Sequence, residues 1–289
     1  MGEGGRQPLP PGVGVLGPDI AIIEDPDDPR VAAFGLNERA LTNRAQKRRD
    51  DGDGLFMAEG DLVVERALAA GCRPVLAMVD ERRPPAITAT LQASGCEVYA
   101  GGDRLRAAVT KLGMPYPVVA LFERPPRPTA DELAGRCSRL ILVEAVDNPV
   151  NVGSIVRNGL ALGWDGLVVD GTSADPLARR ALRVSMGHAV RLPHARTQDL
   201  AHVAATLRAD GWLVCALTPA ADALPLEAVV AAPRTALLVG SERAGLSADA
   251  MAAATHRVSI PMLAGVDSLN AAAATAVACW HLRPAAAHP

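Results

Sequence analysis

Aromatic residues are scarce in this chain. They make up 3% of its 289 residues, whereas hydrophobic residues as a whole make up 49%. The core must therefore be built from Ala, Val and Leu, and the scarcity argues against an aromatic platform for stacking nucleic-acid bases. The hydrophobic fraction is well above that of a disordered chain, so we expect a folded protein with a sizeable core.

Paired cysteines and long apolar runs are also missing. The five cysteines, Cys72, Cys96, Cys137, Cys215 and Cys279, are scattered and include no C-x-x-C pair. This argues against a disulfide framework and a zinc site, so we expect buried free thiols, no metal and a reducing compartment. No apolar run approaches the roughly 20 residues of a membrane helix, and the N-terminus lacks the apolar core of a signal peptide. We therefore expect a cytoplasmic protein without a membrane partner.

Positive charge is not in excess, because the formal net charge is −3. Nucleic-acid binding depends instead on where positive charge is concentrated. One cluster ends with Arg48 and Arg49, and acidic residues follow it at once. A second cluster, without an intervening acidic residue, includes Arg179, Arg180 and Arg183. For both clusters, a solvated helix face competes with a phosphate contact as the explanation.

The first half of the chain predicts a tail, a small α/β domain and a connector. Residues 1–29 are expected to be a flexible tail, because residues 1–18 are rich in Gly and Pro. Residues 30–122 show short alternating patterns, with a helix over Ala58–Ala70 and strands over 74–79, 98–100 and 118–122. Residues 123–138 contain closely spaced prolines, which indicate an exposed linker and a domain boundary.

Residues 139–289 alternate strand and helix patterns regularly. Buried apolar strands separated by helices predict a parallel sheet covered on both faces, and therefore an α/β domain. Such sheets bind ligands at the carboxyl ends of their strands. The expected strands cover 140–145, 166–170, 212–217, 235–240 and 258–260, and the expected helices cover 152–162, 176–186, 199–209 and 268–282.

Three loops at strand ends carry polar residues among glycines and prolines. The first reads DNPVNVGSIVR over 147–157, where Asn151 is the expected helix N-cap and Gly153 would let the backbone approach a ligand. The second reads GSERAGLS over 240–247, with Ser247 as the expected cap of the next helix. The third reads IPMLAGVDSLN over 260–270. Each loop alone could be an ordinary capped connection, and Arg157 alone is more often a solvated helix residue.

Together and in this order, the loops resemble the signature motifs of the SpoU/TrmH methyltransferases in the SPOUT superfamily. Those motifs run N-x-G-x-x-x-R, then a hydrophobic strand with G-x-E-x-x-G-L, then I-P-M followed by G and S-L-N. Residues 183–187, RVSMG, resemble the family's R-x-S-M-G segment, and the whole match spans about residues 140–282. Residues 56–60, FMAEG, resemble the start of a ribosomal-protein-like substrate-binding domain. The layout is similar to that of thiostrepton-resistance rRNA methyltransferases.

The resemblance implies a fold, a cofactor and a reaction. We expect a deep trefoil knot in the C-terminal domain, a homodimer whose active site is completed across the interface, and an RNA-binding domain over 30–122. We expect methyl transfer from S-adenosylmethionine to a ribose 2′-hydroxyl, with rRNA favoured over tRNA. The implied cofactor-binding residues are Gly240, Glu242, Ile260, Met262, Ser268, Leu269 and Asn270. The implied catalytic residues are Asn151, Arg157 and Glu242, and the expected RNA-binding residues are Arg179, Arg180, Arg183, Arg48 and Arg49.

Several alternatives stay open at this stage. Either Glu242 or a phosphate oxygen could accept the proton of the 2′-hydroxyl, because an arginine stays protonated in proteins. A dinucleotide-dependent oxidoreductase would need a glycine fingerprint at the first strand–helix turn, which instead reads DNPVNVG. A non-catalytic RNA-binding relative is disfavoured by the presence of Asn151, Arg157 and Asn270. At 175–177 the chain reads DPL where relatives often carry S-P-Y, so one contact near the RNA is in doubt.

Overall fold

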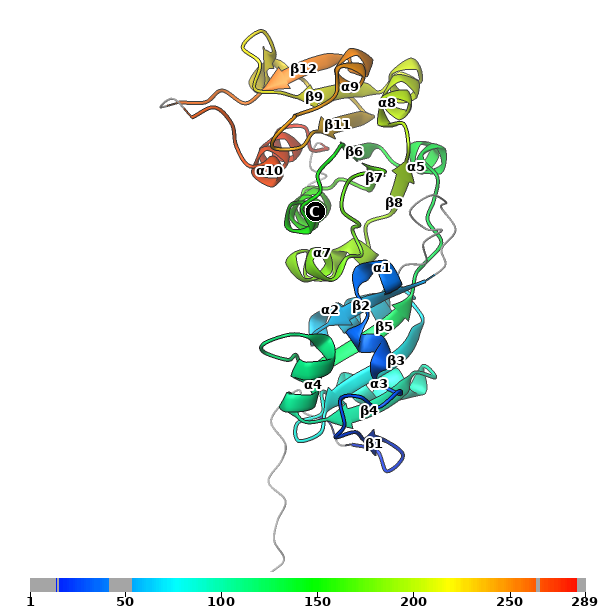
Figure 1. Cartoon of the computed structure of the whole chain (residues 1–289). Helices are drawn as coiled ribbons and strands as arrows, with labels where there is room; N and C mark the ends of the chain where they lie inside the picture. Colours follow the sequence, from blue (N-terminus) through cyan, green and yellow to red (C-terminus); the bar gives the residue numbers. More distant parts are fainter. Residues whose placement is uncertain (1–13, 15, 42–53, 264–265, 285–289) are drawn as a thin grey trace, which may run out of the picture. The chain divides into compact units, whose positions relative to one another are not determined.

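The chain forms two compact units in a computed structural model (Figure 1). The structure describes residues 14, 16–41, 54–263 and 266–284. Among these, the first unit holds the residues up to Arg124, and the second unit holds the residues from Pro125 onward. Two of the predicted RNA-binding residues, Arg48 and Arg49, lie outside the described residues.

The first unit is an α/β domain built on a mixed five-stranded sheet. Its strands, in sheet order, are β1 (Ala21–Ile22), β4 (Glu97–Gly101), β3 (Pro74–Asp80), β5 (Val118–Glu123) and β2 (Leu55–Glu59). The pairs β1–β4 and β3–β4 are parallel, whereas β5 runs antiparallel to β3 and β2. The helices are the short 3-10 turn Ala32–Gly35, α1 (Glu38–Leu41), α2 (Asp61–Ala69), α3 (Ile87–Ala93) and α4 (Asp103–Thr110).

Two predictions for the first unit need correction. The expected tail over 1–29 includes β1, and Ile23 donates its N–H to the Ala100 carbonyl at 2.8 Å and is 1% exposed. A two-residue strand is too short to produce a periodic pattern, so the sequence did not reveal it. The helix expected over 58–70 starts only at Asp61, because Ala58 belongs to β2 and Gly60 (φ 87°) breaks the chain direction between them.

The second unit has a seven-stranded sheet in which every pair of neighbouring strands is parallel. This confirms the predicted parallel α/β architecture. Its strands, in sheet order, are β10 (Leu224–Pro225), β12 (His256–Ser259), β9 (Leu213–Leu217), β11 (Thr235–Val239), β6 (Arg139–Val143), β7 (Gly166–Asp170) and β8 (His194–Thr197). Its α-helices are α5 (Ala130–Arg136), α6 (Pro149–Ala161), α7 (Arg179–Val184), α8 (Leu200–Ala209), α9 (Ala248–Ala253) and α10 (Ala271–His281).

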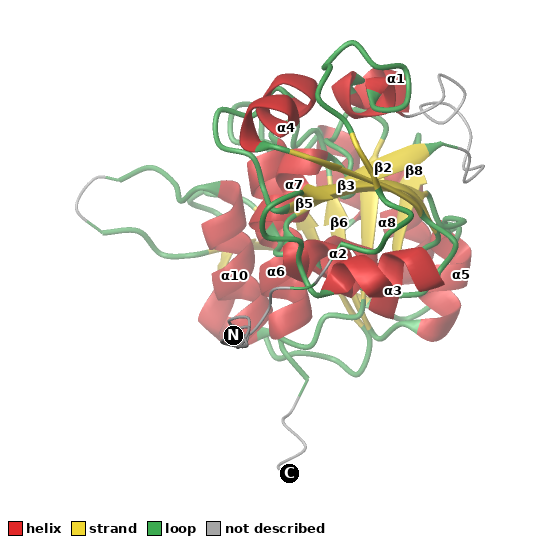
Figure 2. Cartoon of the chain, turned by 90° about the horizontal axis from the view of Figure 1, so that it is seen from below, coloured by secondary structure: helices red, strands yellow, loops and turns green. Residues whose placement is uncertain are grey.

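Helices cover both faces of this sheet. In Figures 1 and 2, α10 lies beside α6 on one face of the sheet, and Figure 1 shows α8 and α9 together on the other face. The core between α8, α9 and the sheet is made mainly of Leu, Val and Ala, with one buried Trp and one buried Cys, as the composition requires. The order β9, β11, β6 places the ends of three central strands next to one another, and this edge carries the candidate site.

The connector predicted over 123–138 contains helix α5, so it is not simply an exposed linker. The helix begins with a capping box, in which the Thr129 side chain accepts from the Glu132 N–H and the Glu132 carboxylate accepts from the Thr129 N–H. Leu133 on this helix is fully buried in the core of the second unit. The T-x-x-E pattern was present in the sequence, but the neighbouring prolines obscured it.

All five cysteines are free and buried, as predicted. Burial raises the pKa of the Cys96 and Cys215 thiols to about 12, because the apolar surroundings disfavour the thiolate. These thiols are therefore unreactive side chains of the core. Within the described ranges, no helix is long and apolar enough to cross a membrane.

Candidate functional site

Helix α6 begins directly after the loop that follows β6. Its N-cap is Asn148, whose side-chain oxygen accepts the Val150 N–H at 2.9 Å, and Pro149 occupies the first helical position. The prediction that Asn151 is the N-cap was wrong by one turn, because proline is favoured immediately after the cap. Asn151 instead lies in the first turn, and its side chain is free to make contacts outside the helix.

The same helix packs closely against α7 through Gly153. A Cβ atom on Gly153 would lie 2.6 Å from the Ala181 carbonyl oxygen. The prediction that Gly153 lets the backbone approach a ligand was therefore wrong. The absence of a side chain at Gly153 instead allows the close approach of α7.

One residue from each of the three loops joins a hydrogen-bonded triangle. Asn151 donates its side-chain amide to Glu242 Oε1 at 2.8 Å. Asn270 donates its amide to Asn151 Oδ1 at 3.0 Å and also to Glu242 Oε1. Asn270 is held in this orientation because its own oxygen caps α10, accepting the Ala272 N–H at 2.9 Å. Residues that are far apart in the sequence thus form one polar cluster at the carboxyl edge of the sheet.

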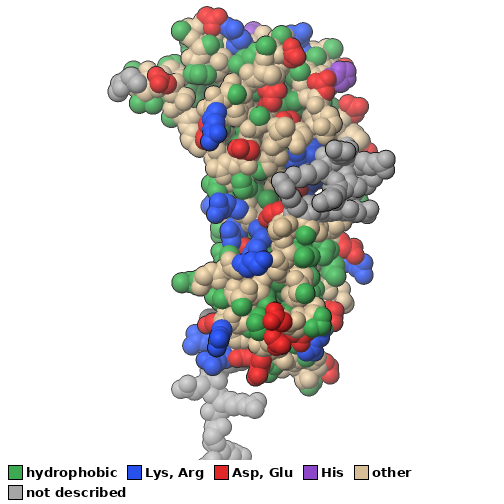
Figure 3. Space-filling view, in the orientation of Figure 1, with side chains coloured by type: hydrophobic (Ala, Val, Ile, Leu, Met, Phe, Trp, Pro, Cys, Tyr) green, Lys and Arg blue, Asp and Glu red, His purple; other side chains and the backbone are tan. Residues whose placement is uncertain are grey.

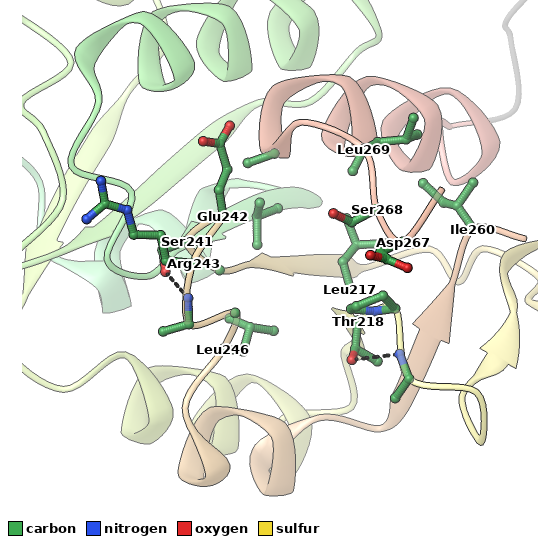
Figure 4. Close-up of a pocket in the computed structure, with 18 of the residues that line it drawn as sticks. Leu217, Thr218, Ser241, Glu242, Arg243, Leu246, Ile260, Asp267, Ser268 and Leu269 are labelled. Atoms are coloured by element: carbon green, nitrogen blue, oxygen red, sulfur yellow. Dashed lines mark hydrogen bonds between the residues drawn. The ribbon is translucent and has the colours of Figure 1, made fainter. Parts of the chain in front are cut away.

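A pocket of about 470 Å³ opens beside this triangle (Figure 4). Its walls come from three segments: residues 217–220 at the end of β9, residues 239–246 at the end of β11, and the segment from β12 into α10. The last segment contributes Ile260, Met262, Asp267, Ser268, Leu269, Ala271 and Ala274. Asn270 does not line the pocket itself, and it reaches the pocket through Glu242. The predicted cofactor residues that do line it are Gly240, Glu242, Ile260, Met262, Ser268 and Leu269.

The wall after β11 is a tightly folded loop. Gly245 donates its N–H to the Ser241 carbonyl at 3.0 Å, which folds the loop back on its own start. A Cβ atom on Gly240 would lie 2.2 Å from the Gly245 carbonyl carbon, a distance that real atoms do not reach. Gly240 is therefore required by the close approach of two backbone segments. Ser247 then caps α9 by accepting the Ala250 N–H, as predicted.

Sequence reasoning missed several residues of the pocket. Thr218, Pro219 and Ala220 follow β9, which carries no motif, yet β9 is the immediate neighbour of β11 in the sheet. Asp267 also lines the pocket, and it is labelled in Figure 4. The position of β9 beside β11, which sequence patterns do not reveal, brings these residues into the site.

Arg157 is exposed on α6 and does not line the pocket of its own chain. It lies six positions after Asn151, which at 3.6 residues per turn places the two side chains on different faces of the helix. Among the described residues, none forms a hydrogen bond or an ion pair with the Arg157 side chain. The structure therefore does not bring Arg157 together with the triangle.

The three predicted RNA-binding arginines of the second unit lie on α7. Arg180 is exposed, and Arg179 and Arg183 are partly buried. The helix extends only over 179–184, shorter than the predicted 176–186, because Met186 adopts a left-handed conformation (φ 54°) that ends it. The face drawn in Figure 3 carries both basic and acidic side chains of the described residues.

Asp175, where the chain departs from the family's S-P-Y segment, has a structural role. Its carboxylate accepts from Arg127 at 2.8 Å and from the Leu177 N–H at 2.8 Å. The ion pair ties the segment before α5 to the segment before α7, within the second unit. These two contacts use the carboxylate of Asp175, which explains why an aspartate stands at this position.

A second acidic residue, Asp170 at the end of β7, supports the loop that leads into α6. Burial alone would raise the pKa of its carboxyl. Hydrogen bonds from Ser173, Thr172 and the Ala145 N–H have the opposite effect and outweigh burial, so the pKa of Asp170 lies below its usual value. Ser173 Oγ in turn accepts the Val146 N–H at 3.0 Å. These contacts fix the loop after β6. They therefore also fix the start of α6, the helix that carries Asn151.

Comparisons with known proteins agree with this arrangement. A model of the SpoU rRNA Methylase family matches residues 138–280. An uncharacterized tRNA/rRNA methyltransferase of Mycobacterium bovis is 38% identical over 269 residues, which are 91% of this chain and 92% of the relative. The 23S rRNA (guanosine(2553)-2′-O)-methyltransferase of Bacillus subtilis is 28% identical over 229 residues, 79% of this chain and 88% of the relative.

A solved structure extends the similarity to the fold. The SpoU methyltransferase AviRb from Streptomyces viridochromogenes, in complex with the cofactor AdoMet, superposes with a TM-score of 0.71 at 27% identity. The alignment covers 88% of this chain and 95% of AviRb, so it includes both units. The chain therefore belongs to the SpoU rRNA methylase family.

Proposed function

We propose that this protein transfers the methyl group of S-adenosylmethionine to a ribose 2′-hydroxyl of ribosomal RNA. The observation that carries the proposal is the triangle of Asn151, Glu242 and Asn270 beside the pocket. Two relatives support its details: AviRb is described in complex with AdoMet, and the Bacillus subtilis relative is named a 23S rRNA 2′-O-methyltransferase.

The pocket suits S-adenosylmethionine in size and charge. Its volume of about 470 Å³ lies in the range of small-molecule sites, roughly 300–1,000 Å³. The carboxylates of Glu242 and Asp267 line it and complement a sulfonium cation, whereas Ile260, Met262 and Leu269 offer apolar contacts to an adenine ring. When bound, the cofactor supplies an activated methyl group. The protein then has to align the attacking oxygen and to remove its proton.

We propose that the proton of the attacking 2′-hydroxyl is accepted by Glu242 or by a phosphate oxygen of the substrate. Two of the three amide hydrogen bonds of the triangle reach Glu242 Oε1, and among the described residues nothing donates to Oε2. The two asparagines therefore orient the carboxylate and leave one oxygen to accept a proton. Arg157 stays protonated and cannot be the base. It would instead hold the neighbouring phosphate and stabilise the developing alkoxide.

We further propose a homodimer in which Arg157 completes the site across the interface, and a trefoil knot formed by the segments around the pocket. The small-residue face of α10 packs inward, since Ala271 and Ala272 are buried within the chain. The outward face is instead a stripe of Ala273, Val277 and Trp280, with Val277 42% and Trp280 57% exposed. An exposed apolar stripe on a helix is the expected surface for a second copy.

Substitution of Val277 by Glu is expected to convert the dimer into a monomer, because the charge would be buried in the interface without a partner. The matched control is Val230→Glu, which introduces the same charge at an 86% exposed valine in the same unit. Analytical ultracentrifugation at micromolar concentration should show a dimer for the wild type and for Val230→Glu. A monomeric wild type would contradict the proposed dimer.

Incubation with cofactor labelled in the methyl group should place the label in 23S rRNA transcripts and not in tRNA. A 2′-O-methyl group blocks alkaline cleavage of the next phosphodiester bond, because the free 2′-hydroxyl is the attacking group. The label should therefore appear in alkali-resistant dinucleotides. Label in mononucleotides would indicate base methylation, and label in tRNA alone would contradict the substrate assignment.

Simultaneous substitution of Arg179, Arg180 and Arg183 by Ala is expected to weaken RNA binding and its dependence on salt. Each phosphate contact releases counterions, so each lost contact should flatten the log–log slope by roughly 0.7–0.9 units. Filter binding over a series of salt concentrations measures the slope. An unchanged slope would identify these arginines as a solvated helix face.

A further inference from the structure

Glu144 is an acidic residue of the second unit to which neither the sequence motifs nor the proposed chemistry gives a role. It directly follows β6, and its N–H donates to the Val239 carbonyl at 2.9 Å, which extends the pairing of β6 with β11. Its carboxylate accepts two hydrogen bonds from one residue: the Ser247 N–H at 2.7 Å and the Ser247 hydroxyl at 2.8 Å. Hydrogen bonds to an ionised carboxylate are about twice as strong as those between neutral groups.

Ser247 stands at the point where the pocket wall ends. The segment from Gly240 to Leu246 lines the pocket, and Ser247 follows it as the N-cap of α9. Four residues of this segment, 242–245, are exposed. An exposed segment makes few tertiary contacts, so its position depends on how its two ends are held. The first end is held by the close approach of Gly240 to Gly245.

The second end has one apolar and one polar anchor. Leu246 inserts into the core between α8, α9 and the sheet and is 8% exposed. The buried leucine side chain anchors the loop to the core, but it does not set the orientation of the loop, because apolar contacts are not directional. The paired hydrogen bonds from Ser247 to Glu144 are directional, and they tie the wall to the strand that leads into α6. Glu144 thereby links the loop of Glu242 to the element that carries Asn151.

We propose that Glu144 is a positioning residue for the cofactor pocket, which through Ser247 holds the loop 240–247 in the conformation that binds S-adenosylmethionine. The inference rests on the proposed function, since it takes this cofactor as the ligand. Glu144 does not line the pocket. Its substitution should therefore act on the affinity for cofactor. Glu242 lies in the same loop but stays oriented by Asn151 and Asn270, so the chemical step should be unchanged once cofactor is saturating.

The test compares Glu144→Ala and Glu144→Gln with the wild type by calorimetry with S-adenosylmethionine. Glu144→Ala should weaken binding by roughly tenfold or more, as expected when two charge-assisted hydrogen bonds are lost. The cofactor affinity of Glu144→Gln should lie between those of the wild type and Glu144→Ala, because the glutamine side chain has the same length but carries no charge. The matched control is Glu227→Gln, an exposed glutamate outside the pocket, which should bind as the wild type does.

A second variant separates positioning from mere stability. Ser247→Ala removes the hydroxyl but keeps the backbone N–H, so Glu144→Ala combined with Ser247→Ala should weaken binding by less than the product of the two single effects. In methylation assays, the KM for cofactor should rise while kcat stays within about twofold of the wild type, because only ground-state binding is lost. Unchanged cofactor affinity in Glu144→Ala, or a loss of kcat with unchanged KM, would overturn the inference. Failure of the wild type to bind the cofactor would instead refute the proposed function.

Discussion

Substitution of Arg157 by Ala is expected to keep cofactor affinity and most RNA affinity while methyl transfer falls by orders of magnitude. The side chain is exposed and lies outside the pocket of its own chain, so it contributes nothing to cofactor binding there. If it holds phosphate and alkoxide, its interaction is strongest in the transition state. Loss of one preorganised charged donor costs on the order of 3 kcal/mol, roughly a hundredfold in rate or more.

Two further variants make this prediction specific. Arg157→Lys should fail nearly as badly, because an ammonium group cannot reproduce the planar two-pronged geometry of a guanidinium. Arg136→Ala, which removes another exposed helix arginine of the same unit, should retain full activity. Single-turnover methylation with saturating cofactor and RNA is the appropriate measurement. Activity of Arg157→Ala within a few-fold of the wild type would remove this residue from the mechanism.

The parallel sheet of the second unit was predictable because its strands are buried on both faces. Such strands appear in the sequence as continuous apolar runs, as in Leu140 to Val143, and the intervening helices give a regular alternation. The edge strand β8 was missed because it reads HART, with polar residues at three of its four positions. An edge strand is less enclosed than a central one, so its composition carries a weaker signal.

The residues of the site were predictable as a set, but their contacts were not. The motif resemblance singled out Asn151, Glu242 and Asn270, yet no pattern states that their side chains hydrogen bond to one another. Those contacts depend on the strand order β9, β11, β6, which brings separated loops to one edge. The same limit applies to Glu144 and Thr218, which were missed because each is adjacent to the site only in space.

Local rules competed with one another where predictions failed. Asn151 and Asn148 are both good N-cap residues, and Pro149 decided between them by favouring the position after the cap. Small residues such as the alanines of α10 permit close helix approach, either within the chain or to a second copy. Ala271 and Ala272 do serve close approach, but to α6 of the same chain, since Asn158 of α6 donates to the Ala272 carbonyl at 3.3 Å.

Substitution of Gly240 by Ala is expected to weaken S-adenosylmethionine binding by roughly a hundredfold, equivalent to about 2.8 kcal/mol at 1.4 kcal/mol per factor of ten. The added Cβ would lie 2.2 Å from the Gly245 carbonyl carbon and 2.4 Å from the Leu246 nitrogen. Both neighbours are backbone atoms, which cannot rotate away as a flexible side chain can. The wall of the pocket must therefore move outward from the site as a unit.

The control for this substitution is Gly135→Ala in helix α5. A Cβ at Gly135 meets nothing within 4 Å, and alanine is favoured over glycine in a helix by about 1 kcal/mol. Gly135→Ala should therefore bind cofactor normally and unfold at an equal or higher temperature. Gly240→Ala should lose stability by only about 1–3 kcal/mol, the usual range for an overpacked site, so the protein remains folded while binding is measured. Calorimetry at a temperature well below both unfolding transitions compares the two variants. If Gly240→Ala bound the cofactor as tightly as Gly135→Ala does, the loop 240–247 would not form the cofactor site.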